Sequence, residues 1–145
     1  AGRCGRNGSH MKEIKIMSRN EAKTYSAHKD IPESAIISIY SSGDVPCHFC
    51  KNGRIKAVGK WCFDDLADDR GITQEQANQI AAFVKRNEFI ETLIVHCDAG
   101  ISRSAGIAAA ISKWYFGTDE AVFDNPQYIP NMRCYNLMIN ALYNI

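Results

Sequence analysis

The chain has 145 residues, which is enough for one domain of ordinary size and too few for several. Hydrophobic residues make up 46% and charged residues 23%, so the chain can bury a core, and a net charge of +1 gives no general attraction to nucleic acid or to a membrane surface. No apolar run approaches the ~20 residues that a membrane-spanning helix needs.

The first residues differ in composition from the rest of the chain. Residues 1–10 are rich in glycine and polar residues, and Gly8-Ser9-His10-Met11 is typical of a protease site joined to a cloning remnant. We therefore expect residues 1–10 to be an expression tag and residues 11–145 to form a single domain. Five cysteines follow residue 10 without any signal peptide, and an odd number does not suit a disulfide framework. This favours a reducing, cytoplasmic location.

Strand and helix patterns alternate along the chain. Short apolar runs predict strands at residues 13–17, 35–40, 55–63 and 92–96. Helices are predicted after the capping boxes Ser18-Arg19-Asn20-Glu21 and Thr73-Gln74-Glu75-Gln76, over residues 104–116, and after the cap Asn131. The alternation predicts a single-domain α/β fold with a mostly parallel central sheet of about four or five strands flanked by helices.

The segment His96-Cys97-Asp98-Ala99-Gly100-Ile101-Ser102-Arg103-Ser104 joins the most buried predicted strand to the most buried predicted helix. Ligands of α/β sheets bind at this carboxyl end of the strands. The backbone from Asp98 to Arg103 can point several N–H groups inward as an anion nest, and the start of the following helix adds positive potential. The same field favours the reactive thiolate of Cys97. We predict a phosphate-binding turn around a cysteine nucleophile.

The side chains around this turn suit the same chemistry. The planar guanidinium of Arg103 can hold two phosphate oxygens at once and stays charged at any working pH. Ser104 can donate a hydrogen bond to the Cys97 sulfur and so help it to leave. His96 can orient the turn through its ring nitrogens.

Transfer of a phosphoryl group also needs a proton for the leaving oxygen. Four carboxylates follow the strand predicted at residues 55–63, and they are Asp64, Asp65, Asp68 and Asp69. Composition alone leaves all four as candidates for the general acid.

The pattern Cys-x5-Arg-Ser preceded by His, at residues 96–104, resembles the signature of the protein tyrosine phosphatase superfamily. The whole domain is similar to the compact dual-specificity-like branch, especially to short tyrosine phosphatases of bacteria and phages. Trp61-Cys62-Phe63-Asp64-Asp65 resembles the general-acid loop of PRL-type phosphatases, where the second Asp lies 32 residues before the nucleophile, as Asp65 does here. The resemblance therefore implies Asp65 as the acid, with Asp64 as the second choice. Pro130-Asn131 resembles the dipeptide that opens the last helix of dual-specificity enzymes, which makes Asn131 a residue that orients the loop.

The resemblance implies a cysteine-dependent phosphomonoester hydrolase that works through a cysteinyl-phosphate, with no metal or organic cofactor. Residues 11–145 are then its catalytic domain. The expected partner is a phosphorylated protein or peptide, phosphotyrosine above all, and inorganic phosphate or sulfate should bind at the same site. Neither a membrane nor nucleic acid is an expected partner.

Three other functions use similar residues. Phosphatases of inositol phosphates, phosphoinositides or RNA 5′-phosphates share the loop and prefer a basic rim, for which Lys51, Arg54, Lys56 and Lys60 are available. A phosphate-binding pseudophosphatase usually lacks the cysteine or the arginine, and both are present. A rhodanese-type sulfur transferase also uses a loop cysteine, but the His-Cys and Arg-Ser pairs and the upstream aspartate argue against it.

Two further cysteine motifs have more than one interpretation. Cys47-His48-Phe49-Cys50 resembles half of a zinc site, but no second pair follows at a suitable spacing, so a surface loop is favoured. Cys62 is either a redox partner that forms a disulfide with Cys97, or a strand residue that faces the core, and we favour the second.

Overall fold

The computed structural model describes residues 10–50 and 52–144. Residues 1–9 of the expected tag lie outside this part, so the tag stays a prediction. Within the described part, no helix is long and apolar enough to cross a membrane.

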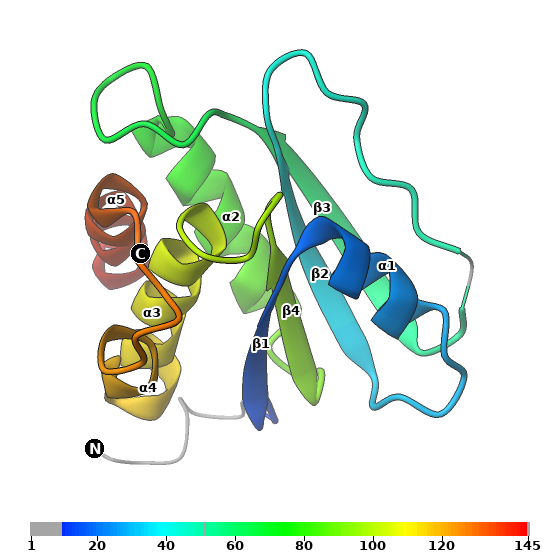
Figure 1. The fold of residues 1–145 in the computed structure, drawn as a ribbon. Helices are drawn as coiled ribbons and strands as arrows, with labels where there is room; N and C mark the ends of the chain where they lie inside the picture. Colours follow the sequence, from blue (N-terminus) through cyan, green and yellow to red (C-terminus); the bar gives the residue numbers. More distant parts are fainter. Residues whose placement is uncertain (1–9, 51, 145) are drawn as a thin grey trace.

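One central sheet of four strands organises the molecule, in the order β1-β4-β2-β3, and every neighbouring pair is parallel. The strands are β1 (Glu13–Met17), β2 (Ser34–Tyr40), β3 (Ile55–Cys62) and β4 (Thr92–His96). All five residues of β4 are buried, because β1 and β2 flank it and helices cover both faces of the sheet (Figure 1). The predicted parallel α/β fold is confirmed.

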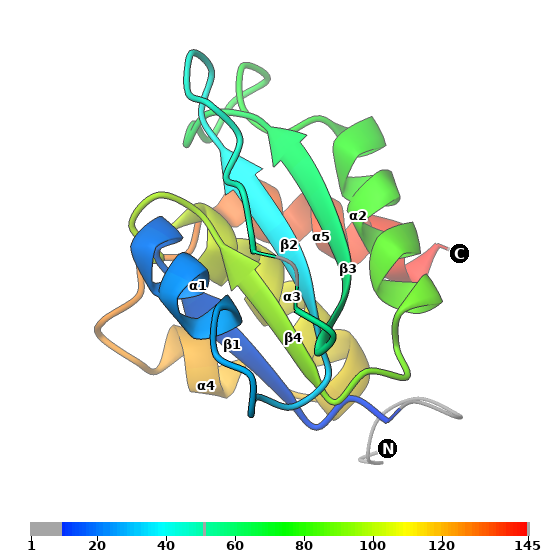
Figure 2. The ribbon, with the colours of Figure 1, turned by 90° about the vertical axis from the view of Figure 1, so that its right-hand side faces the viewer.

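Helices form a layer on each face of the sheet. Helices α2 (Gln74–Arg86), α3 (Arg103–Phe116) and α5 (Met132–Tyr143) cover one face, whereas α1 (Arg19–Ser26) lies over the other (Figures 1 and 2). The four-residue helix α4 (Glu120–Phe123) follows α3 and was not predicted from the sequence.

Local hydrogen bonds start these helices where the sequence predicts. In α1 the Ser18 side chain accepts from the Glu21 N–H while the Glu21 carboxylate accepts from the Ser18 N–H, so the first capping box is complete. Thr73 and Gln76 form the second capping box, before α2. Asn131 caps α5 by accepting from the Cys134 N–H at 3.0 Å. These caps satisfy N–H groups that a helix terminus leaves unpaired.

One of the expectations about cysteines is wrong. Cys62 is exposed and does not face the core, because β3 is an edge strand whose alternation turns Trp61 inward and Cys62 outward. The loop around Cys47 lies on the surface as expected, with His48 and Cys50 exposed, but Cys47 itself is fully buried. Its neighbour Phe49 packs edge-on against the His96 ring, with centroids 5.7 Å apart, so this loop lies against the α1 face of the sheet. Among the described residues, no group of three or more His, Cys, Asp or Glu side chains is placed to hold a metal ion.

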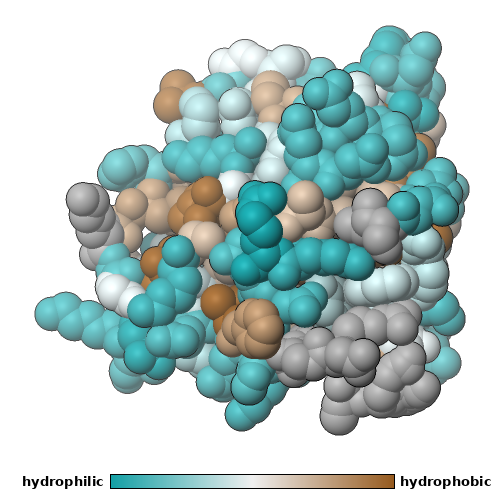
Figure 3. Space-filling view, turned by 180° about the vertical axis from the view of Figure 1, so that it is seen from behind, coloured by the Kyte–Doolittle hydropathy of each residue, from teal (hydrophilic) through white to brown (hydrophobic). Residues whose placement is uncertain are grey.

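The outer surface contrasts with this interior. Seen from behind, the described residues present a mostly hydrophilic face, on which apolar side chains form small separate groups (Figure 3). That face offers no broad apolar area for docking among the residues shown in colour.

Helices α3 and α5 approach each other closely at Gly106. A Cβ atom at this position would collide with the carbonyl oxygen of Asn131, which begins α5. We expect Gly106→Ala to lower the free energy of unfolding by ~1–3 kcal/mol, because the two helices would have to separate. Urea denaturation measures this effect. In the control Gly53→Ala a Cβ meets no atom within 4 Å, and an equal loss in both variants would contradict the packing argument.

Candidate active site

Cys97 directly follows β4, and its side chain is 2% exposed. Its sulfur lies 3.1 Å from the Ser104 hydroxyl, which belongs to the first turn of α3. The structure therefore brings together the two residues for which the sequence predicts nucleophile and leaving-group roles. Residues 97–102 are called the Cys97 loop below.

The carbonyl groups of the Cys97 loop are held by the elements around it. Four accept hydrogen bonds: Cys97 O from the His96 ring at 3.3 Å, Asp98 O from the Arg19 N–H at 3.2 Å, Ile101 O from the Ile129 N–H at 3.0 Å, and Ser102 O from the Asn131 N–H at 3.0 Å. Among the described residues, by contrast, no oxygen accepts from the backbone N–H groups of residues 99 to 105. Partnered carbonyls with free N–H groups at a helix start are the features of an anion-binding nest.

His96 holds the beginning of this loop from inside the core. It is fully buried, and its Nε2 lies 2.6 Å from the Ser38 hydroxyl on β2. The Cys97 carbonyl can only accept, so Nδ1 carries the proton and Nε2 accepts from Ser38. Burial lowers the pKa of His96, which keeps the ring neutral in this tautomer.

Gly100 lets the loop close against the end of β1. Its φ is +71°, in the left-handed region, and a Cβ there would lie 2.6 Å from the Met17 carbonyl carbon and from the Ser18 nitrogen. A side chain at this position would strain the backbone and push the loop away from the sheet.

Arg103 is 5% exposed, and its guanidinium is almost fully partnered. Nη1 donates to the Ser41 hydroxyl at 2.9 Å and to the Phe63 carbonyl at 2.8 Å, while Nη2 lies 3.3 Å from an Asp98 carboxylate oxygen. Nε is buried and has no acceptor among the described residues. Because buried donors are normally paired, this N–H fits the oxygen of a bound anion.

Ser41 is a site residue that the sequence analysis missed. It follows β2 directly, accepts from Arg103 and donates to Asp98 Oδ2 at 3.0 Å. A polar residue at the carboxyl end of a buried strand is the signal that could have identified it.

The four candidate acids have different surroundings. Asp65 Oδ1 accepts from the Ser102 hydroxyl and from the Asn131 amide, each at 2.8 Å. The Asp64 carboxylate accepts hydrogen bonds from both the backbone N–H and the hydroxyl of Ser42. These two bonds, the backbone one above all, hold the pKa of Asp64 below its usual value.

The remaining two carboxylates are exposed. Asp68 pairs with Arg70 at 2.7 Å, and this hydrogen bonding lowers the pKa of Asp68 to about 2. Asp69 is exposed as well. Of the four, all within the described part of the chain, only Asp65 lines the pocket that contains Cys97.

This pocket has a volume of about 390 Å³. Its lining consists of Asp65, Cys97, Asp98, Ala99, Ile101, Ser102, Arg103 and Ile129. Ile101 and Ile129 are 39% and 72% exposed, so the rim is partly apolar. The floor suits an anion and the rim suits a flat apolar group.

The basic residues that would favour a polyanionic substrate lie elsewhere. Lys51 is outside the described residues, and Arg54, Lys56 and Lys60 are not among those that line the pocket. Lys56 lies 3.5 Å from Glu33, and Arg54 donates to the Ile31 carbonyl.

The fold of this chain matches solved structures of other proteins. No protein-family model matches the sequence, and no curated protein matches it. The crystal structure of human DUSP28 superposes with a TM-score of 0.60 at 14% identity, covering 90% of this chain and 92% of that one. Tk-PTP in its active form gives a TM-score of 0.53 at 12% identity, covering 96% of this chain and 99% of that one. The chain has the fold of the tyrosine phosphatase superfamily. The likeness to bacterial and phage enzymes and the PRL-like acid loop stay predictions.

Within this phosphatase fold, Cys134 of α5 is a second buried thiol near the pocket. Burial, followed by the negative charge of Asp65, raises the pKa of Cys134 to about 12, so the thiol stays protonated at neutral pH. We expect iodoacetamide at pH 8 to modify the exposed Cys50 and Cys62 long before Cys134, as measured by peptide mass spectrometry. Equal rates at Cys50 and Cys134 would contradict the assigned environment.

Proposed function

We propose that this chain is a cysteine-dependent phosphomonoester hydrolase that prefers phosphotyrosine in proteins or peptides. The observation that carries the proposal is the single pocket in which Cys97, the unpaired N–H groups of its loop, Arg103 and Asp65 meet. The fold shared with two phosphatase structures supports the reaction class. The described cysteines are all free, which suits the reducing cytoplasmic setting that belongs to the same proposal.

Phosphate binding follows from the unpaired donors. The N–H groups of the Cys97 loop and of the first turn of α3 donate to the phosphate oxygens, and the buried Nε of Arg103 donates to another. Because Ser41 and the Phe63 carbonyl already fix Nη1, the guanidinium need not reorganise when the phosphate enters.

In the first step the Cys97 thiolate attacks phosphorus, so a sulfur–phosphorus bond forms as the bond from phosphorus to the tyrosine oxygen breaks. Protonated Asp65 gives its proton to that oxygen, and tyrosine leaves. In the second step water attacks the cysteinyl-phosphate and loses a proton to the Asp65 carboxylate. The sulfur–phosphorus bond breaks, and the Ser104 hydroxyl, 3.1 Å away, stabilises the departing thiolate.

The preference for an aryl ester rests on the rim of the pocket. Ile101 and Ile129 present exposed apolar side chains on which a phenyl ring can pack, whereas the chain of phosphoserine is too short to use both. The alternative substrates with several phosphates lack support. Of the basic residues proposed to bind them, Arg54, Lys56 and Lys60 are described, and none of these lines this pocket.

Replacement of the nucleophile is the first test. We expect Cys97→Ser to abolish hydrolysis of N-acetyl-phosphotyrosine amide, since a serine hydroxyl is not ionised there. The variant should still bind inorganic phosphate, as measured by calorimetry. Cys50→Ser, at an exposed cysteine, is the matched control and should keep full activity. Appreciable turnover by Cys97→Ser would refute the assignment.

The choice of acid has a second, independent test. Asp65→Asn should lower kcat for phosphotyrosine by ~10²–10⁴, the contribution of one general acid. The loss should be smaller with p-nitrophenyl phosphate, whose leaving group needs less protonation. Asp64→Asn should leave kcat close to that of the unmodified chain, because the Asp64 carboxylate is bound to Ser42. A larger loss in Asp64→Asn than in Asp65→Asn would reverse the assignment.

A further inference from the structure

Strand β1 (Glu13–Met17) is an edge of the sheet. It pairs with β4 on one side, and among the described residues no strand pairs with its other side. An edge strand presents backbone N–H and C=O groups to which an incoming extended segment can pair.

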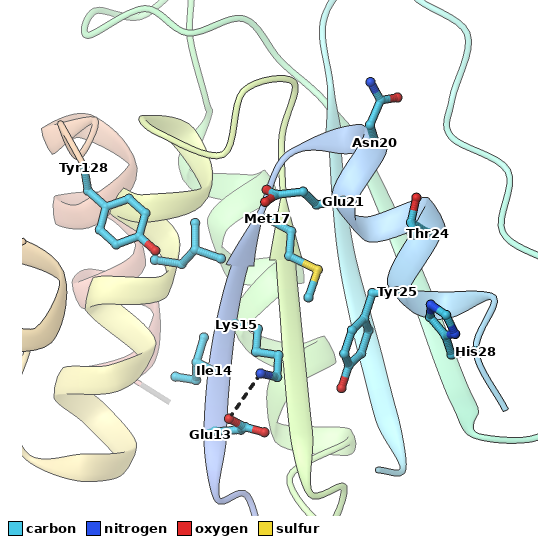
Figure 4. A pocket seen from close by; sticks show the side chains of 11 residues that line it. Glu13, Ile14, Lys15, Met17, Asn20, Glu21, Thr24, Tyr25, His28 and Tyr128 are labelled. Atoms are coloured by element: carbon cyan, nitrogen blue, oxygen red, sulfur yellow. Dashed lines mark ion pairs between the residues drawn. The ribbon is translucent and has the colours of Figure 1, made fainter. Parts of the chain in front are cut away.

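A hollow of about 730 Å³ follows this free edge (Figure 4). Side chains from both faces of β1 line it, among them Ile14 and Lys15, so the hollow runs along the edge itself. Tyr25 of α1 and His28, just after α1, line it on one side and Tyr128 on the other, as the close-up shows. Its lining is thus mixed, with aromatic, apolar and charged groups.

A second, smaller hollow lies on the α3 side of the same strand. It has a volume of about 180 Å³, and Ile14 and Ile16 line it together with Phe116 of α3 and Val122 of α4. Because the side chains of an extended segment alternate between two faces, a strand added to β1 would place one set in this apolar hollow. The other set would lie between β1 and α1.

The edge also leads to the phosphate site. The Cys97 loop packs on the end of β1, where Gly100 meets the Met17 and Ser18 backbones. Tyr128 of the large hollow is followed in the chain by Ile129, which lines the pocket of Cys97. Both hollows are therefore lined by residues of β1, and the large one adjoins the catalytic pocket in the chain at residues 128–129.

We infer that the free edge of β1 is a docking groove for the polypeptide substrate, in which the extended segment beside the phosphotyrosine pairs with β1 as an added strand. The inference rests on the proposed phosphatase function and adds how the enzyme recognises its substrate. Backbone pairing makes recognition depend on an extended peptide, and the apolar hollow favours apolar side chains at alternate positions of that segment.

The length of the substrate tests the groove. We compare kcat/KM for N-acetyl-phosphotyrosine amide with that for phosphotyrosine peptides extended by six alanine- and valine-rich residues on the amino side alone or the carboxyl side alone. One of the two extensions should raise kcat/KM by about tenfold, the effect of one or two net backbone hydrogen bonds. Equal gains from both sides, or no gain, would overturn the inference.

A pair of tryptophan variants locates the effect. Thr24 of α1 is exposed and lines the large hollow, whereas Ala27, just after α1, is exposed and lies outside it. Thr24→Trp should fill the groove and remove the gain from the extended peptide, with kcat/KM for the capped amino acid unchanged. Ala27→Trp should retain the gain.

The outcomes separate the two proposals. If Thr24→Trp keeps the full gain, the groove is refuted while the phosphatase function stands. If the unmodified chain does not hydrolyse N-acetyl-phosphotyrosine amide, the proposed function fails and the groove fails with it. Sedimentation that shows a dimer of the unmodified chain, lost in Thr24→Trp, would assign the edge to a second copy and overturn the inference.

Discussion

The candidate site depends on where the carbonyl groups of the Cys97 loop find their partners. An unpaired buried carbonyl is costly, and four carbonyls of this tight turn have donors. The donors come from the His96 ring, the start of α1 at Arg19, and the backbone at Ile129 and Asn131. Since these segments take the carbonyls, the N–H groups of the same loop are left for a ligand. The candidate anion site is therefore a consequence of how three segments surround one turn: the end of β4, the start of α1 and residues 129–131.

Arg103 is held by the same kind of arrangement. Arg103 is 5% exposed, so its guanidinium needs acceptors, and Ser41, the Phe63 carbonyl and Asp98 supply them. The two serines after β2 have different partners. Ser41 contacts Arg103 and Asp98, whereas Ser42 donates hydrogen bonds to Asp64. The ends of β2 and β3 are thereby joined to the Cys97 loop. One donor, Nε, has no acceptor in the described part of the chain, and a phosphate oxygen can accept from it.

Asn131 connects the pocket to the packing of the helices. Its side chain caps α5 and donates to Asp65, and its backbone N–H holds the Ser102 carbonyl. The absence of a side chain at Gly106 allows this segment to approach α3. A residue that begins a helix thus also holds Asp65 and the Cys97 loop in place.

The sequence by itself determined the four strands, every helix except the four-residue α4, and the segment at the centre of the candidate site. Capping boxes at Ser18 and Thr73 act within three residues, and Cys97, Arg103 and Ser104 stand in one short segment, so spacing alone reveals them. Tertiary structure alone decided which carboxylate faces the pocket. Asp64 is bound by a residue 22 positions away, and Asp65 by one 66 positions away. The burial of Cys47, the exposure of Cys62 and the free edge of β1 depend likewise on strand order. Sequence patterns such as capping boxes reflect interactions between residues within about one helical turn of each other, whereas these features arise where distant segments meet.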